Sequence, residues 1–207
     1  MIKKIEGLYF GIDYGSVEIT ERIVNEVADR LDEILPSKVE RSCYDVPLRA
    51  AKGDIEFDNE SLVVICVPVI KGRIPMPCIR LMQHMHSKGT LTIAVVNYTG
   101  AGYGQSLYEL YSFMEGQGFK VISAGAFVSH IASKRTPRII AVNRPDMRDF
   151  EYLRTFGSLT GGKLKRLMGT DVDCLKCKPA PLDITYRTGI AVTIVQAVKR
   201  KEPEWFL

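Results

Sequence analysis

The chain has 207 residues, with 46% hydrophobic and 25% charged residues and a formal net charge of +4. These values are typical of a globular protein long enough to bury a core, and we expect a single domain. The net charge is too small, and the basic run Lys199–Lys201 too short, to predict a nucleic-acid-binding arm. No apolar run approaches the ~20 residues of a membrane span, and the basic start is not followed by the apolar region of a signal peptide. We therefore expect a cytoplasmic protein with neither nucleic acid nor a membrane as a partner.

The amino-terminal segment predicts a strand, a loop and a helix. Gly7–Ile12 is short and apolar, as a buried strand is, and turn residues follow it. Apolar side chains then recur at helical spacing over residues 19–34, and Pro36 ends the helix. We expect Ser16 or Thr20 to be its N-cap.

The same segment allows a second interpretation. Free backbone N–H groups at the start of a helix, together with hydroxyl groups, form an anion site. Gly15, Ser16 and Thr20 would then line a phosphate site. On the residues alone the capping interpretation is slightly favoured, because neither a GxGxxG nor a Walker lysine pattern is present.

Two apolar runs, Leu62–Val67 and Leu91–Val96, form the centre of the predicted sheet. They are apolar at consecutive positions, which is typical of strands buried on both faces. A helix over Cys78–His86 connects them, and such a βαβ unit requires a parallel sheet. Ligands of parallel α/β sheets bind beyond the carboxyl ends of the strands. We therefore expect the binding surface at the loops Pro68–Pro77 and Asn97–Gly104.

The composition of these loops suits a flat ligand. Three prolines stiffen the first loop, and three glycines let the backbone of the second approach a ligand closely. Tyr98 and Tyr103 offer flat faces for stacking, and Arg73 is long enough to reach an anionic or carbonyl group.

The remaining predicted elements are an edge strand at Lys38–Val46, a helix at Gln105–Glu115, a strand at Phe119–Phe127, a helix that starts at Arg144–Phe150 and is interrupted by Gly161 and Gly162, a helix at Thr188–Lys199, and a segment Trp205–Leu207 that packs back on the body.

No metal site is predicted. His84 and His86 are two residues apart and do not share a helix face. Cys174 and Cys177 form a C-x-x-C pair, but no second pair exists to complete a zinc site or a cluster.

Several stretches resemble the flavodoxin-like domain of flavodoxin–ferredoxin fusion proteins. They are L-Y-F, T-E-R-I-V-N-E-V-A, L-V-V-I-C-V-P-V-I-K-G-R-I-P-M-P, V-V-N-Y-T-G-A-G-Y-G-Q-S-L-Y-E-L, G-F-K-V-I-S-A-G-A-F and N-R-P-D-M-R-D-F. Together they cover most of residues 7–157, and neither four-cysteine ferredoxin run is present. The resemblance implies an α/β fold, a flavodoxin-like three-layer sandwich with a five-stranded parallel sheet in the order 2-1-3-4-5 and helices on both faces. We place the core of the single domain (1–207) at about residues 5–157 and a carboxyl-terminal helical extension at 158–207.

The resemblance also implies an FMN site. Ser16 and Thr20 would contact the FMN phosphate, the loop from Pro68 would flank one side of the isoalloxazine ring, and the loop from Tyr98 to Tyr103 the other, with one of these tyrosines stacking on it. The predicted cofactor-binding residues are Gly15, Ser16, Thr20, Pro68, Val69, Ile70, Gly72, Arg73, Asn97, Tyr98, Thr99, Gly100, Gly102 and Tyr103. No catalytic residue is predicted, because the chemistry would reside in the flavin.

The leading interpretation is an FMN-binding electron-transfer protein whose partner is a separate redox protein such as a ferredoxin. Two alternatives stay open. Asp13 and Glu18 lie near the phosphate position and would repel it, which favours a flavodoxin-like domain without flavin that acts as an interaction module. An FMN-dependent NAD(P)H or quinone reductase, often a homodimer, would have the same fold, and the fold does not separate carrier from enzyme.

Overall fold

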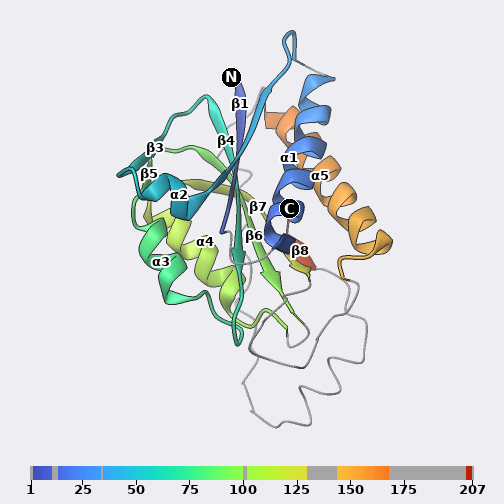
Figure 1. Cartoon of the computed structure of the whole chain (residues 1–207). Helices are drawn as coiled ribbons and strands as arrows, with labels where there is room; N and C mark the ends of the chain where they lie inside the picture. The colour runs from blue at the N-terminus through green and yellow to red at the C-terminus, as the bar shows by residue number, and fades with distance from the viewer. Residues whose placement is uncertain are drawn as a thin grey trace.

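The computed structural model describes residues 2–10, 14–33, 35–99, 102–129, 144–167 and 204–206 (Figure 1). Five strands of the main sheet are parallel and stand in the spatial order β2-β1-β4-β6-β7. Their bounds are β1 Lys4–Tyr9, β2 Glu40–Asp45, β4 Ser61–Pro68, β6 Leu91–Tyr98 and β7 Lys120–Val128. Counted in chain order this is 2-1-3-4-5, so the predicted fold class is confirmed.

Two further pieces of strand structure add to this sheet. β8 (Glu204–Phe206) pairs antiparallel with β7 and extends the sheet at that edge, so the predicted return of the Trp205 segment to the body is confirmed. β3 (Ile55–Phe57) and β5 (Met85–Ser87) form a separate two-stranded parallel sheet.

Helices cover both faces of the main sheet (Figure 1). α1 (Tyr14–Asp32) and α5 (Met147–Leu167) pack side by side on one face. α2 (Val46–Ala50), α3 (Met76–Met82) and α4 (Ser106–Gly116) lie on the other. No helix in the described ranges is long and apolar enough to cross a membrane.

The core divides into two layers because β4 is buried on both faces. Every residue of β4 is buried. Val63, Ile65 and Val67 belong to the layer under α3 and α4, whereas the residues between them belong to the layer under α1 and α5. Each fully buried aliphatic side chain contributes about 1.5–3 kcal/mol. This alternation between two apolar layers explains why the strand is hydrophobic at consecutive positions.

Two carboxylates near the amino terminus of the chain, Glu6 on β1 and Asp32 on α1, are held by nearby donors. Glu6 on β1 is only 3% exposed, and its carboxylate lies 2.8 Å from the Arg49 guanidinium and 3.3 Å from the Lys4 ammonium. Asp32 accepts a hydrogen bond from the Val39 N–H at 2.7 Å and another from Arg41 at 2.6 Å. The Val39 N–H holds the pKa of Asp32 below its usual value, and Arg41 lowers it further.

Three predicted boundaries are wrong. The first strand ends at Tyr9 rather than Ile12. The helix predicted over Cys78–His86 ends at Met82, and His86 lies in β5. α5 continues through Gly161 and Gly162, where the sequence predicted an interruption.

Packing against α1 explains the uninterrupted α5. A Cβ at Gly157 or Gly161 would lie within 3 Å of the side chains of Glu26 and Arg30 on α1. These glycines are four residues apart on one face of α5, and they let the two helices approach closely. The predicted helix at 188–199 lies outside the described residues, and the single-domain organisation stays a prediction.

Candidate functional site

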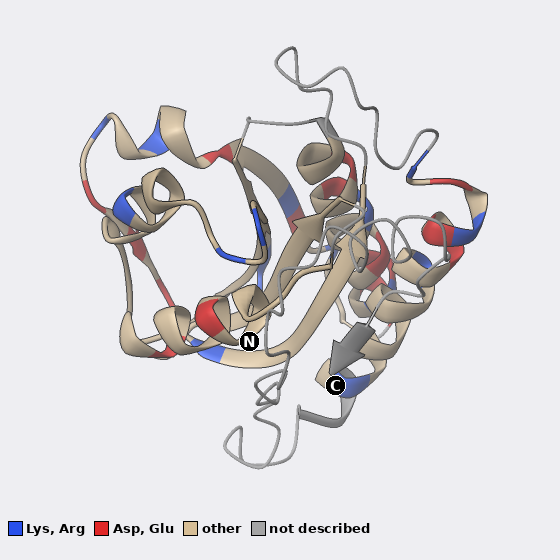
Figure 2. Cartoon of the chain, turned by 90° about the horizontal axis from the view of Figure 1, so that it is seen from below, with Lys and Arg blue, Asp and Glu red and all other residues tan. Residues whose placement is uncertain are grey.

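The sheet has its topological switch point between β1 and β4. These strands are neighbours, but the helix that follows β1 covers one face and the helix that follows β4 covers the other. In open α/β sheets the crevice beyond the carboxyl ends of such strands is the usual ligand site. Figure 2 views the molecule from this end of the parallel strands. The predicted site residues in the described part of the chain lie around it.

A buried cluster of hydroxyl and amide groups joins α1 to the ends of β6 and β7. The Asn97 side-chain amide donates to Ser16 Oγ at 3.2 Å, and its oxygen accepts a hydrogen bond from the Ser129 hydroxyl. The Thr20 hydroxyl donates to the Ser16 carbonyl at 2.7 Å. All four residues are fully buried. Asn97 therefore fixes the start of α1 against the sheet.

The prediction that Ser16 or Thr20 caps the helix is wrong. α1 begins at Tyr14, so both residues lie inside it, and Thr20 bonds the carbonyl four residues before it as a mid-helix threonine does. Gly15 lies next to Ser129, and a Cβ there would overlap the Ser129 side chain. A glycine is thus required where α1 meets the end of β7.

Glu18 does not lie at the start of α1. The first turn of this helix contains no acidic residue, and the Glu18 carboxylate pairs with Arg22 one turn further on, at 3.1 Å. Asp13 lies outside the described residues. The Glu18 carboxylate is therefore neutralised away from the helix end.

The two predicted binding loops contact each other directly. The chain turns sharply at Ile70–Arg73, with paired backbone hydrogen bonds of 3.0 and 3.2 Å, and both central residues have positive φ. Gly72 then accepts a hydrogen bond from the Gln105 N–H at 3.2 Å. Gly104 has φ +55°, and a Cβ there would lie 2.6 Å from the Gly72 carbonyl oxygen. Only a glycine lets the loops approach this closely.

Side chains strengthen the contact between the loops. Tyr98 and Tyr103 are 2% and 6% exposed, and their ring centroids lie 5.6 Å apart. Arg73 pairs with Glu109 on α4, and the same carboxylate accepts a hydrogen bond from the Ile74 N–H at 3.2 Å. In this structure the tyrosines therefore pack against one another, with their rings tilted by 58°, and Arg73 is held by a carboxylate.

The other predicted site residues lie along the same edge. Pro68 is the buried last residue of β4, and Thr99, which is half-buried, follows β6. The Val69 N–H donates to the Asn97 carbonyl at 2.8 Å, which ties the first loop to the buried cluster. Gly102 is half-buried with φ +91°. Gly100 and the C-x-x-C segment lie outside the described residues.

Sequence reasoning missed two residues of this edge. Ser129 directly follows β7, so its position at the carboxyl end of a predicted strand could have indicated it, as it did Asn97. Arg144 precedes α5 and is paired with Asp149, and this hydrogen-bonded carboxylate raises the pKa of the Arg144 guanidinium. The side chains of Arg144 and Asp149 are largely buried, with 15% and 6% exposed. No periodic pattern marks Arg144, because it lies in a connection.

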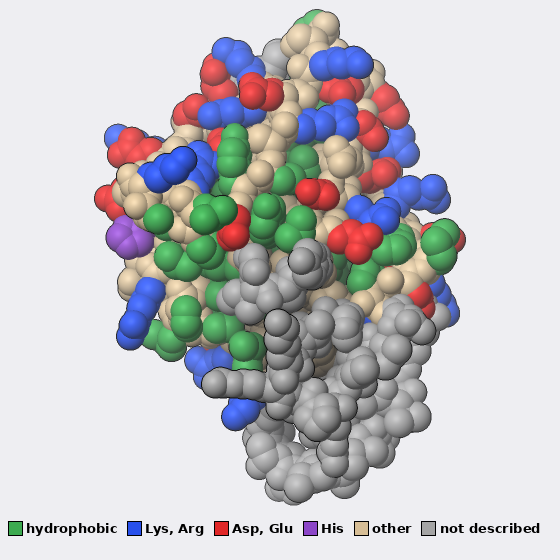
Figure 3. Space-filling view, viewed as in Figure 1, with side chains coloured by type: hydrophobic (Ala, Val, Ile, Leu, Met, Phe, Trp, Pro, Cys, Tyr) green, Lys and Arg blue, Asp and Glu red, His purple; other side chains and the backbone are tan. Residues whose placement is uncertain are grey.

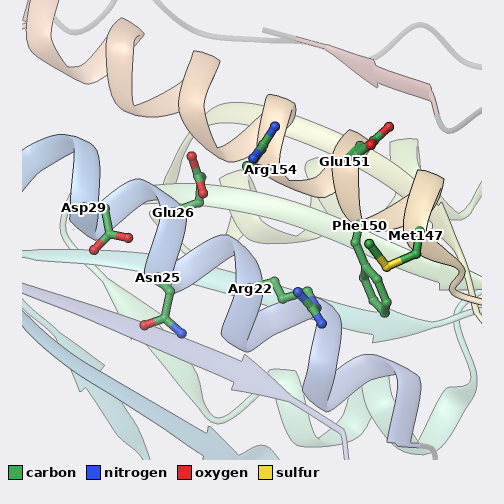
Figure 4. A pocket seen from close by; sticks show the side chains of 8 residues that line it. All are labelled: Arg22, Asn25, Glu26, Asp29, Met147, Phe150, Glu151 and Arg154. Carbon is green, nitrogen blue, oxygen red and sulfur yellow. The ribbon is translucent and has the colours of Figure 1, made fainter.

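A groove lies elsewhere, between α1 and α5 (Figure 4). It has a volume of about 400 Å³. Arg22, which lies over the Phe150 ring at 3.7 Å, and Arg154 line it together with three acidic residues. Since both signs of charge face the groove, it favours neither an anion nor a cation.

The comparisons with known proteins agree with this architecture. An archaeal flavodoxin superimposes with a TM-score of 0.52 at 12% identity, over 78% of this chain and 99% of that chain. The chain has a flavodoxin-like fold. An oxidoreductase from Corynebacterium diphtheriae gives a TM-score of 0.56 at 13% identity, over 80% and 96% of the two chains. The apo form of the NADH:FMN oxidoreductase EmoB gives 0.52 at 11% identity, over 78% and 89%.

These similarities extend to the fold alone. No protein-family model matches the chain, and no curated protein matches it in sequence. Flavodoxin-like folds carry several functions, so the function has to be argued from the edge residues. The relation to flavodoxin–ferredoxin fusion proteins stays a prediction.

Proposed function

We propose that this flavodoxin-like protein binds FMN at the carboxyl edge of its sheet and carries electrons. One observation carries the proposal. The start of α1 and the two loops converge beyond the switch point between β1 and β4, and Asn97 contacts both α1 and the first loop. Two of the similar structures are named as a flavodoxin and an NADH:FMN oxidoreductase, which supports a flavin as the ligand.

The start of α1 suits the phosphate of FMN. Helix starts leave backbone N–H groups without intrahelical partners and attract anions. The first turn of α1 has no acid, and Glu18 is paired with Arg22. Because the hydroxyls of Ser16 and Thr20 are buried and used inside the protein, we propose that backbone groups from Gly15 onward hold the phosphate.

The ring end requires the two loops to separate. A planar ring would enter between Ile70–Arg73 and the Tyr98–Tyr103 loop, which breaks the hydrogen bond from Gln105 to Gly72 and parts the two tyrosines. This opening costs about 1–3 kcal/mol, which lowers the apparent affinity roughly 5- to 150-fold. Bound FMN would supply the redox chemistry, and the chain would orient the ring and exclude water from it. A separate redox protein, such as a ferredoxin, would exchange the electrons.

A charge placed at the start of α1 tests this proposal. Val17 is in the first turn of α1 and half-buried, and Leu159 on α5 is 45% exposed and serves as the matched control. At ~8 Å from a phosphate dianion and an effective dielectric constant of ~40, a carboxylate costs about 2 kcal/mol. We expect Val17→Glu to weaken FMN binding about thirtyfold and Leu159→Glu to leave it unchanged.

Titration of FMN fluorescence at constant ionic strength measures these affinities. Riboflavin, which lacks the phosphate, should bind Val17→Glu and the wild-type protein equally. Wild-type protein that is folded and does not quench FMN at micromolar concentration would remove the proposal. Equal loss of FMN and riboflavin binding in Val17→Glu would contradict the position of the phosphate.

A second candidate function is supported by the closed loops. Because Tyr98 packs against Tyr103 and Gly72 bonds Gln105, the two loops are joined by the protein's own contacts, as they would be in an interaction module. The same titration distinguishes the two functions, since a module of this kind leaves FMN fluorescence unchanged. Sustained NADPH oxidation with a quinone acceptor would instead assign an FMN-dependent reductase, and gel filtration would show whether it is a homodimer.

A further inference from the structure

An exposed surface adjoins the ring end of the candidate site. We define the α3 face as Ile70, Lys71, Met76, Pro77 and Arg80, all of which are exposed. Ile70 and Met76 are 51% and 59% exposed, and exposed apolar side chains that gather in a patch are typical of interaction sites. Met76 and Arg80 are four residues apart in α3 and lie on the same side of it. Figure 3 shows hydrophobic and basic side chains beside one another over α3 and the loop before it, at the lower left.

The stretch of sequence that contains the α3 face carries charge of one sign. From Ser61 to Tyr108 the sequence contains no Asp or Glu, and its cationic residues are Lys71, Arg73, Arg80 and Lys88. Arg73 is neutralised by Glu109. Within the described ranges, Lys71 and Arg80 form no salt bridge, so the α3 face combines exposed apolar side chains with two uncompensated positive charges.

We propose that the α3 face is the docking surface for an acidic protein, the electron-transfer partner; this inference rests on the proposed function. Exposed apolar side chains together with charged ones are the usual composition of a transient protein interface, in which Met and Arg are enriched. Opposite charges on the partner accelerate encounter and fix its orientation. Ile70 belongs to both the α3 face and the loop beside the proposed ring, so a partner docked here would lie beside the proposed flavin site.

Charge decides between this partner and other occupants. A second copy of this chain in a two-fold contact would bring like charges together, at a cost of several kcal/mol. Nucleic acid is held by many phosphate contacts, whereas the α3 face offers only two cations, Lys71 and Arg80, among exposed apolar side chains. An acidic protein with an apolar contact surface matches both properties of the face.

A matched pair of charge reversals tests the proposal. Arg80 on α3 and Arg154 on α5 are both exposed arginines, on opposite faces of the sheet, and their reversal changes the net charge equally. The probe is a strongly acidic ferredoxin, titrated calorimetrically into the full chain at low ionic strength. We expect Arg80→Glu to weaken binding about tenfold and Arg154→Glu less than about twofold. Met76→Ser should weaken binding and Met147→Ser, also on α5, should not.

The following results would overturn the inference. Equal weakening by Arg80→Glu and Arg154→Glu would show attraction by net charge alone. No binding of the ferredoxin, or equally Arg80-dependent binding of duplex DNA or of anionic phosphatidylserine vesicles, would reject an acidic protein as the occupant. The proposed function fails separately: if FMN does not bind but ferredoxin binding depends on Arg80, the docking surface stands and the flavin does not. If FMN binds and the ferredoxin does not, only the docking surface is lost.

Discussion

Replacing Asn97 by alanine removes the group that joins α1 to two strands. The Asn97 amide donates a hydrogen bond to Ser16, and its oxygen accepts one from the Ser129 hydroxyl, in a region with no exposure to solvent. Losing these contacts costs about 1–3 kcal/mol for the buried hydroxyl of Ser129, which loses its acceptor, and about 1 kcal/mol for the bond to Ser16. We therefore expect Asn97→Ala to lower the free energy of unfolding by about 2–4 kcal/mol.

Urea denaturation followed by circular dichroism measures this loss. The matched control is Asn59→Ala, because Asn59 is exposed in a turn before β4, and we expect it to change stability by less than about 0.5 kcal/mol. Since domains of this kind are stable by about 5–15 kcal/mol, the Asn97 variant should still fold. A loss below about 1 kcal/mol for Asn97→Ala would refute the argument that this amide fixes α1 on the sheet.

Three further predictions follow from contacts in the fold. Arg49→Met leaves the Glu6 carboxylate buried with only the Lys4 ammonium nearby. Urea titration should then show a free energy of unfolding lower by about 2–4 kcal/mol. An unchanged free energy of unfolding would mean that Glu6 does not need Arg49 as a partner. The Asp32 carboxylate has a folded pKa below its usual value of 3.8, so its contribution is fully present above pH 3.8 and is lost as the pH falls below it. Thermal melts from pH 6 to pH 2 should fall less steeply for Asp32→Asn than for the wild-type protein, and parallel curves would contradict the coupling. Gly104→Ala combines a positive φ with a clash against the other loop and should lower the melting temperature by a few degrees, and an unchanged value would show that the loops do not need this approach.

The sheet could be predicted from the sequence because its central strands are marked by composition. β4 and β6 are apolar at consecutive positions, and this pattern follows directly from burial on both faces. The interruption of the helix that was predicted at Gly161 is wrong because the deciding contact is not local in the sequence. The place of Gly161 inside α5 depends on the Arg30 side chain of α1, which is far away in the sequence, and a local pattern does not contain that information.

The candidate site could be located from the sequence but not described. Because the carboxyl ends of parallel strands meet at one edge of the sheet, Asn97 and the two loops could be placed there correctly from the sequence. The sequence did not show that Tyr98 and Tyr103 turn into the core, since loop aromatics are equally suited to stacking on a ligand and on each other. Nor did it show that the Ser16 hydroxyl is used by an amide from another strand.

Hydrogen–deuterium exchange with and without FMN tests the central claim most directly, because it reports both binding and its place. We predict that FMN slows exchange of the backbone amides at the start of α1, in the Ile70–Arg73 turn and in the Tyr98–Tyr103 loop, and leaves β2 and the carboxyl-terminal half of α4 unchanged. Unchanged exchange at these three places in the presence of saturating FMN, or protection confined to another part of the fold, would contradict the account.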